Sequence, residues 1–323
     1  MFCFLSDNTD PFFNIASEEF LLKNYEEDIV LLYINEPCVI VGKHQNTLAE
    51  INYRYVTENQ IKVIRRISGG GTVYHDNGNL NFTFITSGQQ GNLVNFKRYT
   101  QPIVDSLNRA GINAQLENKN NLYVDGIKIS GNAEHIYKNR VLHHGTLLFS
   151  VNLQALSEAL RFTQGKYIDK AVKSISSNLA NIGSLSGKIQ DIVDLQKNLI
   201  DYIKNEAVDF QLITFKDYEL CKIASLIKEK YSTWDWNFGY SPDYEFHNKV
   251  QIKNIHLEIK LFVAKGIIED SEIKIDGQLN EKLSKLLRKT RHEKNEIVKI
   301  LNQSNSGIEF SEEEINNLIW EFF

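Results

Sequence analysis

The stretch RRISGGGTVYHD, residues 65–76, places three consecutive glycines between two β-prone runs. Adjacent glycines lose much backbone entropy on folding, so a folded chain keeps them where the backbone turns sharply or approaches another group closely. Without Cβ atoms the main-chain N–H groups can face an anion, and Arg65, Arg66 and Ser68 add further donors. The residues alone leave two interpretations open: an anion-binding loop beside a strand, and a flexible hairpin tip.

The flanking sequence predicts both helices and strands. Residues 14–27 carry apolar side chains near helical spacing, whereas residues 79–86 alternate between apolar and polar side chains as a strand does. The runs IVLLYIN (29–35) and CVIVGK (38–43) flank Glu36-Pro37, which predicts that the two strands pair across a turn.

Two further turns predict hairpins. Asp125-Gly126 separates β-prone runs, and Lys138-Asn139 does the same farther along the chain. Consecutive hairpins mixed with helices indicate an α+β fold with a largely antiparallel mixed sheet and flanking helices. Trp234 and Trp236 precede Gly239 and Pro242 at an expected domain end, so we expect a catalytic domain at 1–245 and a small α+β accessory domain at 248–323.

Composition restricts the class of protein. The chain has 323 residues, of which 42% are hydrophobic and 24% charged, as in ordinary soluble domains. The net charge of −5 gives no reason to expect nucleic-acid binding. There is no apolar run of about 18 residues and no basic leader, so we expect no membrane span. Three cysteines without a CxxC pair favour a reducing, cytoplasmic setting over a disulfide framework or a zinc site.

The chemistry-bearing residues favour positioning and charge over covalent catalysis. Lys128 lies in an expected strand after a tight turn. Such a lysine is most often solvated, but it can also stabilise charge that develops when a carboxylate attacks phosphorus. His143 and His144 point to opposite faces of a strand and cannot chelate one metal together. No Ser/His/Asp constellation is visible, and Cys38 lies in an apolar run.

Three motifs occur in a fixed order: RRISGGGTVYHD (65–76), KISGNA (128–133) and HHGTLLF (143–149). Further stretches extend the pattern: DPFFNIASEE (10–19), VGKHQNTLAEIN (41–52) and WDWNFG (234–239). Over nearly its whole length the sequence resembles lipoate–protein ligase A. The resemblance implies an α+β catalytic domain shared with biotin protein ligases. It also implies a two-step reaction, in which lipoate and ATP form lipoyl-adenylate and the lipoyl group then passes to a lysine.

The resemblance also implies a set of site residues. Lys128 matches the lysine that bridges the lipoyl carboxyl and the phosphate, and is the implied catalytic residue. The implied nucleotide site, with Tyr74 near adenine, is formed by Arg66, Gly71, Thr72, Val73, Tyr74 and Lys128. The implied lipoate site is formed by Ser68, Gly69, Gly70, His75, Lys128, His144 and Gly145.

The implied co-substrate is ATP with Mg²⁺, and the implied acceptors are apo lipoyl domains of 2-oxoacid dehydrogenases and the glycine-cleavage H protein. We expect a cytoplasmic monomer. The family usually has Asn-Asp before the lysine, whose aspartate helps to hold magnesium. Here Asn120-Asn121 stands instead, so Asn121 offers an amide oxygen, which is a weaker ligand for a hard dication. Lys43 replaces an arginine, and residues 172–182 lack the arginines common there.

Three rival functions remain. An octanoyl or lipoyl acyltransferase of the same superfamily would need a cysteine nucleophile, and none lies in or near the three motifs. A biotin ligase would carry a basic Gly-Arg-rich loop that this sequence lacks. A paralogue that binds lipoate without turnover is the third, and the departure at Asn121 supports it.

Overall fold

The computed structural model describes residues 1–88, 93–117, 120–160, 166–185, 187–252, 255–302 and 312–323. The chain forms two compact units, and each contains separate stretches of sequence. The first unit contains Met1–Lys43, Ile61–Glu158 and Ser174–Thr233. The second contains His44–Gln60, Ala159–Lys173 and Trp234–Phe323.

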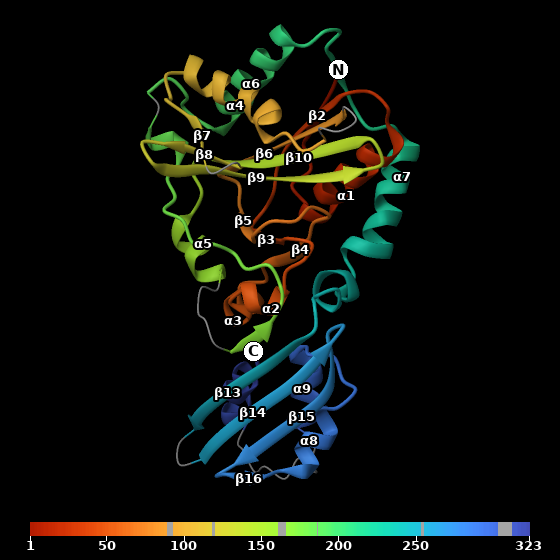
Figure 1. Ribbon diagram of the computed structural model, residues 1–323, viewed down its shortest axis with the longest axis vertical. Coiled ribbons are helices and arrows are strands. Elements are labelled where there is room, and N and C mark those ends of the chain that lie inside the picture. The colour runs from red at the N-terminus through yellow and green to blue at the C-terminus, as the bar shows by residue number, and fades with distance from the viewer. Residues whose placement is uncertain (89–92, 118–119, 161–165, 186, 253–254, 303–311) are drawn as a thin grey trace. The chain divides into compact units, whose positions relative to one another are not determined.

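The centre of the first unit is an eight-stranded mixed sheet (Figure 1). Its strands, in spatial order, are β12 (Gln211–Ile213), β1 (Phe2–Ser6), β2 (Ile29–Ile34), β6 (Asn79–Ser87), β10 (Arg140–Leu148), β9 (Ile127–Tyr137), β8 (Asn121–Val124) and β7 (Gln115–Glu117). Strand β1 runs parallel to β12 and β2, and every other neighbouring pair is antiparallel. The expected largely antiparallel α+β fold is confirmed.

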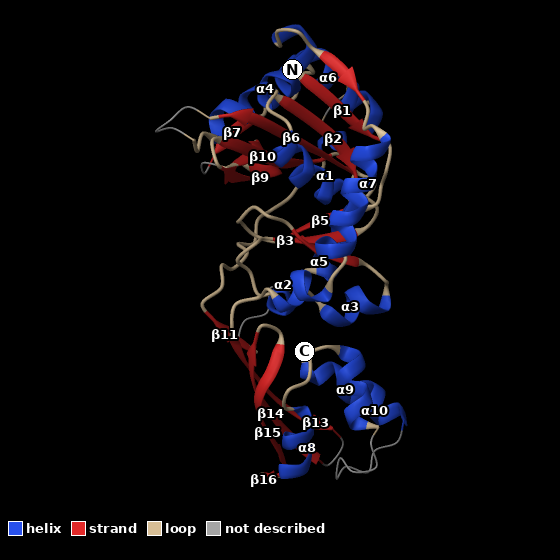
Figure 2. Cartoon of the chain, turned by 90° about the vertical axis from the view of Figure 1, so that its right-hand side faces the viewer, coloured by secondary structure: helices blue, strands red, loops and turns tan. Residues whose placement is uncertain are grey.

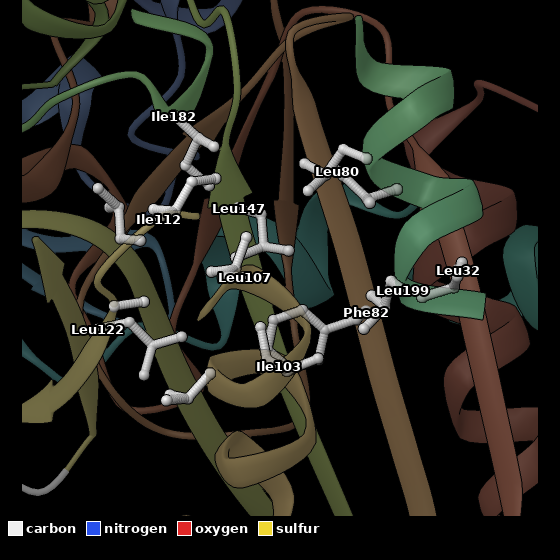
Figure 3. Close-up of a cluster of buried hydrophobic side chains, with 14 of the residues drawn as sticks. Leu32, Leu80, Phe82, Ile103, Leu107, Ile112, Leu122, Leu147, Ile182 and Leu199 are labelled. Atoms are coloured by element: carbon white, nitrogen blue, oxygen red, sulfur yellow. The ribbon is translucent and has the colours of Figure 1, made fainter. Parts of the chain in front are cut away.

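Helices cover both faces of this sheet (Figure 1, Figure 2). Helices α4 (Phe96–Arg109) and α6 (Ile192–Glu206) pack on one face, where alternate strand residues form the main hydrophobic core. Figure 3 shows Leu32, Leu80, Phe82 and Leu147 from the strands meeting side chains of the two helices. Helix α4 begins at its cap Asn95 and is followed by Gly111 at φ +87°.

Helix α1 (Pro11–Asn24) lies on the other face and contacts β2, β6 and β10. It also contacts β4 (Lys62–Arg65) of a three-stranded sheet, whose order is β4, β3 (Cys38–Val41), β5 (Val73–His75). Because α1 packs against two sheets, most of its side chains are buried, including Glu18 and Glu19. Its Asp10 cap and Pro11 at the first position are typical of a helix start.

The predicted pairing of residues 29–35 with 38–43 is wrong. Strand β2 belongs to the eight-stranded sheet, and β3 pairs with β4 and β5 instead. Glu36-Pro37 therefore carries the chain from one sheet to another. Since both runs are buried and β-prone, nothing local to them distinguishes the two arrangements.

The other helical elements of the first unit are short. Helix α7 (Asp217–Leu226) and the π-helical turn η2 (Ile227–Tyr231) pack on α1. Helix α5 (Leu153–Ala159) follows β10, and the 3₁₀ turn η1 (Ile182–Ser184) adds Ile182 to the main core.

The second unit is a five-stranded sheet with helices (Figure 2). Its strands are β11 (Tyr167–Asp169), β13 (Tyr244–Ile252), β14 (Ile255–Ala264), β15 (Ile267–Ile275) and β16 (Gln278–Leu279). The helical elements are α2 (Thr47–Glu50), α3 (Tyr53–Glu58), η3 (Asp235–Gly239), α8 (Glu281–Leu287), α9 (Lys294–Leu301), α10 (Glu312–Leu318) and η4 (Ile319–Phe322). Leu48 of α2 lies in the same hydrophobic cluster as β13–β15 and α8.

The small α+β part at the C-terminal end is also as expected. The functional boundary near residues 245–248 stays a prediction, because compact packing does not test which segments serve catalysis. No helix in the described ranges is long and apolar enough to cross a membrane.

Candidate active site

The triple-glycine stretch is a crossing loop and not a hairpin tip. Strands β4 and β5 do not pair with each other, because each pairs with a different edge of β3. Residues 66–72 therefore carry the chain from one side of β3 to the other. Of the two interpretations open from the sequence, the hairpin tip is wrong.

Arg66 holds this loop from inside. Its Nε donates to Ser68 Oγ at 2.9 Å, and its Nη1 donates to the carbonyl of Ile40 at 3.1 Å. Its Nη2 donates to the carbonyls of Gly69 and Gly71 at 2.6 and 2.7 Å. Four of the five guanidinium protons are thus engaged, and one on Nη1 has no partner among the described residues. Burial lowers the pKa of Arg66 to about 10, so the group is charged at neutral pH.

Two of the three glycines lie close to neighbouring groups. Gly70 has φ +90°, and a Cβ there would lie 3.0 Å from Arg66 Nη2 and 3.7 Å from the Cβ of Ala133 in β9. A Cβ on Gly71 would lie 3.1 Å from Ser174 Oγ. At Gly69 a Cβ would meet nothing within 4 Å, so the loop is open at that position.

A buried hydrogen-bonded chain continues from Ser68 into the sheet. Ser68 Oγ lies 2.6 Å from His144 Nε2, and His144 Nδ1 lies 2.9 Å from the Glu18 carboxylate. Tyr33 and Thr83 also donate to Glu18, at 3.0 and 2.5 Å. Burial alone raises the pKa of Glu18, but the interaction with His144 and the hydrogen bonds outweigh it and hold the pKa below its usual value.

Sequence reasoning missed Glu18. The signal that could have found it is its spacing, since Ile15, Glu18, Glu19 and Leu22 fall on one helical stripe that should be apolar. A carboxylate on such a stripe needs a partner, because an unpaired buried charge is strongly unfavourable.

His75 is a neutral donor held in a buried position. Its Nδ1 accepts from the side-chain amide of Asn35 at 3.0 Å, which places the proton on Nε2. That Nε2 is buried and has no partner among the described residues. Burial, followed by the positive charge of Arg66, lowers the pKa of His75 to about 3. A ligand acceptor is the group that would satisfy this proton.

The remaining residues of the implied nucleotide segment follow the loop directly. The Thr72 amide donates to Ser174 Oγ at 2.9 Å. Val73 and Tyr74 lie in β5, where alternation directs them to opposite faces, and Tyr74 is buried. Residues 172–182, which lack the family's usual arginines, thus reach the glycine loop through a serine.

Lys128 lies near the start of β9, after a hairpin turn in which Asp125 and Gly126 both have positive φ. Its side chain folds over Gly131, where a Cβ would lie 3.4 Å from Lys128 Nζ and 3.8 Å from Asn121 Oδ1. Burial lowers the pKa of Lys128. No carboxylate pairs with its ammonium within the part of the chain that the structure describes.

One segment connects Lys128 with the glycine loop. The Lys128 amide donates to the carbonyl of Asn178 at 3.1 Å, and the Ala180 amide donates to the carbonyl of Lys128 at 3.1 Å. Since Ser174 of the same segment accepts from Thr72, residues 174–180 contact both motifs. The implied nucleotide residues are therefore brought together by contacts within one unit.

The described residues near Lys128 provide few ligands for a metal ion. In the described ranges, no group of three or more His, Cys, Asp or Glu side chains is placed to hold one. Asn121 contributes a single amide oxygen, and Asp125 is an exposed turn residue. This set does not form a protein cage for magnesium.

His144 and Gly145 lie side by side in β10 but differ in role. The neighbouring His143 points to the opposite face, where its Nδ1 lies 3.0 Å from Glu134, so the two histidines do not share a site. A Cβ on Gly145 would lie 2.1 Å from Asn132 Oδ1 and 2.4 Å from Phe82 Cζ. Gly145 is therefore required by packing.

The cysteines do not offer a nucleophile. Cys38 is the backbone partner of His75 between β3 and β5, which brings it closer to the loop than the sequence suggests. Its thiol is fully buried, and burial raises its pKa well above the ordinary value. Cys3 is also buried, with its pKa raised to about 12, and only Cys221 is exposed.

Known proteins are similar to this chain in sequence and in fold. A family model described as the lipoyl protein ligase A/B catalytic domain matches residues 10–204. A relative from Staphylococcus aureus named lipoate–protein ligase 1 is 42% identical over 275 residues, which cover 84% of this chain and 83% of the relative.

Solved structures agree. A putative lipoate protein ligase from T. acidophilum with bound lipoic acid has a TM-score of 0.64 at 25% identity, covering 73% of this chain and 98% of its own. A lipoate-protein ligase A bound with ATP has a TM-score of 0.63 at 25% identity, covering 74% and 98%. The chain therefore belongs to the lipoyl protein ligase A/B family.

Proposed function

We propose that Lys128 is the residue through which this chain activates lipoate. The observation that carries this is a half-buried ammonium without a carboxylate partner in the described structure, in a chain of this family. The names of the relatives and the ATP- and lipoic-acid-bound structures confirm the enzyme class that the sequence predicts, an ATP-dependent lipoate–protein ligase, and adenylate formation is part of this proposal.

The reaction has two steps. An oxygen of the lipoate carboxylate attacks the α-phosphorus of ATP, forming a C–O–P mixed anhydride while the bond to pyrophosphate breaks. The amine of an acceptor lysine then attacks the acyl carbon, forming an amide, losing a proton and expelling AMP. Both first reactants are anions, so a fixed cation between them lowers the barrier by positioning and charge neutralisation. We assign that role to Lys128.

The other site residues are proposed from the same geometry. The remaining Nη1 proton of Arg66 and the backbone of Gly71, Thr72, Val73 and Tyr74 would meet the nucleotide. The open position at Gly69 supports a lipoyl chain lying along Gly69 and Gly70. The unpartnered Nε2 proton of His75 supports a ligand contact there. The resemblance, and not the geometry, is the ground for proposing Ser68, His144 and Gly145 as the wall of the lipoate site.

Magnesium is proposed to arrive as part of the Mg·ATP substrate, with the amide oxygen of Asn121 as a protein ligand. The described residues form no cage of carboxylates for the ion, so the charge neutralisation assigned to the protein is that of Lys128. The proposed acceptors are apo lipoyl domains of 2-oxoacid dehydrogenases and the glycine-cleavage H protein, and the proposed state is a cytoplasmic monomer. The octanoyl-transfer alternative finds no accessible thiol in the loop region.

The first test is lipoate-dependent exchange of labelled pyrophosphate into ATP. Wild-type protein is expected to exchange label only when lipoate is present, since the reversible adenylation step needs the acyl anion. Biotin serves as the control acid. Exchange with biotin but not lipoate, or tight lipoate binding without exchange, would contradict the proposal.

A further inference from the structure

Four buried side chains form one continuous chain from helix α1 to the glycine loop. Arg66 Nε donates to Ser68 Oγ at 2.9 Å, Ser68 Oγ lies 2.6 Å from His144 Nε2, and His144 Nδ1 lies 2.9 Å from Glu18. Ser68 and Glu18 are fully buried, and Arg66 and His144 are nearly so. Water is thus largely excluded from every link.

The protons of this chain have one fully satisfied arrangement. Arg66 Nε must donate, so Ser68 Oγ accepts there and has its own proton to give. His144 Nε2 is the one acceptor near that proton in the described structure, so Nε2 is unprotonated. His144 then carries its proton on Nδ1 and donates it to the Glu18 carboxylate. Every proton along the links from Arg66 Nε to Glu18 meets an acceptor when the imidazole is neutral.

This arrangement makes Glu18 the counter-charge of Arg66. The positive guanidinium and the negative carboxylate lie at the two ends, joined by two neutral groups. A buried guanidinium with only carbonyl partners would be strongly disfavoured, and a remote carboxylate offsets part of that penalty. The two charges are coupled in this sense, since Glu18 opposes the effect of burial on the pKa of Arg66.

Glu18 is itself held by rigid elements. Its carboxylate accepts from Tyr33 of β2, Thr83 of β6 and His144 of β10, three strands of the same sheet. The backbone of α1 fixes its other end. These hydrogen-bonded side chains therefore fix the position of Arg66 relative to the sheet. Arg66 in turn donates to the carbonyls of Gly69 and Gly71.

We propose that Glu18 and His144 are positioning residues that act through Ser68 to orient the Arg66 guanidinium and the glycine loop for adenylation. The inference rests on the proposed function. Both ring nitrogens of His144 are engaged within the protein, so its part in a lipoate site would be contact through carbon atoms only.

The matched test compares Glu18→Gln with Glu134→Gln. Glu134 forms the same kind of buried contact, 3.0 Å from His143 Nδ1, but on the opposite face and without a link to Ser68. Glu18→Gln is expected to lower kcat for lipoate-dependent exchange about tenfold to a hundredfold, the range of one charge-assisted hydrogen bond. The KM for lipoate should change less than about threefold. Glu134→Gln should keep its wild-type kcat.

A double mutant tests the route. If Glu18 acts through Ser68, then Glu18→Gln combined with Ser68→Ala should be no slower than the worse single variant, because residues acting as a unit are non-additive. A loss equal to the product of the single losses would overturn the route. A wild-type rate for Glu18→Gln, or an equal loss in Glu134→Gln, would overturn the proposal.

A measurement on the wild-type protein covers the case in which these variants do not fold. In ¹⁵N-histidine spectra at pH 7.5, His144 is expected to be neutral, with Nδ1 protonated and Nε2 bare. An imidazolium, or the opposite tautomer, would contradict the proposed order of donors and acceptors from Arg66 to Glu18. This result does not depend on turnover, so it separates failure of the inference from failure of the proposed ligase activity.

Discussion

Replacing Lys128 with methionine removes one charge and keeps most of the side chain. The ammonium is half-buried, its pKa is lowered by burial, and no carboxylate in the described structure offsets its charge. Its favourable interactions are therefore expected to arise only with the two bound anions. One well-placed donor to developing charge contributes about 2.7–4 kcal/mol, so Lys128→Met should lower the rate of lipoate-dependent exchange about a hundredfold to a thousandfold.

The thermal stability of Lys128→Met, unlike its exchange rate, is not expected to fall. Since burial disfavours the charged lysine, its removal should leave the melting temperature unchanged or raise it. Lys138→Met is the matched control, because Lys138 is exposed in the turn that follows the other end of β9. Exchange by Lys128→Met within about threefold of wild type would refute the assignment. A marked loss of stability would show that Lys128 has a structural role instead.

Three further outcomes are expected. Gly145→Ala should destabilise the fold by about 1–3 kcal/mol in urea unfolding, because the added methyl would collide with Asn132 and Phe82; an unchanged midpoint would contradict this packing. Burial lowers the pKa of His292 from 6.5 to about 4, so the unfolded chain takes up the proton first as pH falls. As the pH falls from 6.5 to about 4, the free energy of unfolding should therefore decrease by about 1.4 kcal/mol per pH unit. The variant His292→Gln should lack this contribution to the pH dependence. Iodoacetamide should alkylate Cys221 in the native protein without loss of exchange activity, whereas inactivation would revive the thiol-dependent alternative.

Local signals accounted for much of the fold. Asp125-Gly126 adopts positive φ at both turn residues, as its turn signal predicts, because a tight turn depends on neighbouring residues alone. The ordered motifs likewise led to the family. Pattern and turn chemistry therefore suffice where the physics is local.

Features that depend on distant partners were not accessible in this way. The separation of β2 from β3 depends on which sheet each strand joins, and both are equally apolar. The crossing of residues 66–72 depends on β3 lying between β4 and β5. The partners of Glu18 come from three strands spread over more than a hundred residues, so only its position on the stripe of α1 could have indicated a role.

The packing of residues 44–60 and 159–173 is a further non-local feature. Leu48 joins the hydrophobic cluster of β13–β15, and β11 pairs with β13. Both segments lie within the sequence range expected for the catalytic domain. No local pattern reveals such packing, because it depends on pairings with residues far along the chain.

The central claim is best tested by the mass of an apo lipoyl domain after incubation with this protein, ATP, magnesium and lipoate. The account predicts a gain of one lipoyl group that requires ATP and is lost in Lys128→Met. No gain while lipoate still binds, or a gain that proceeds equally well without ATP, would contradict it.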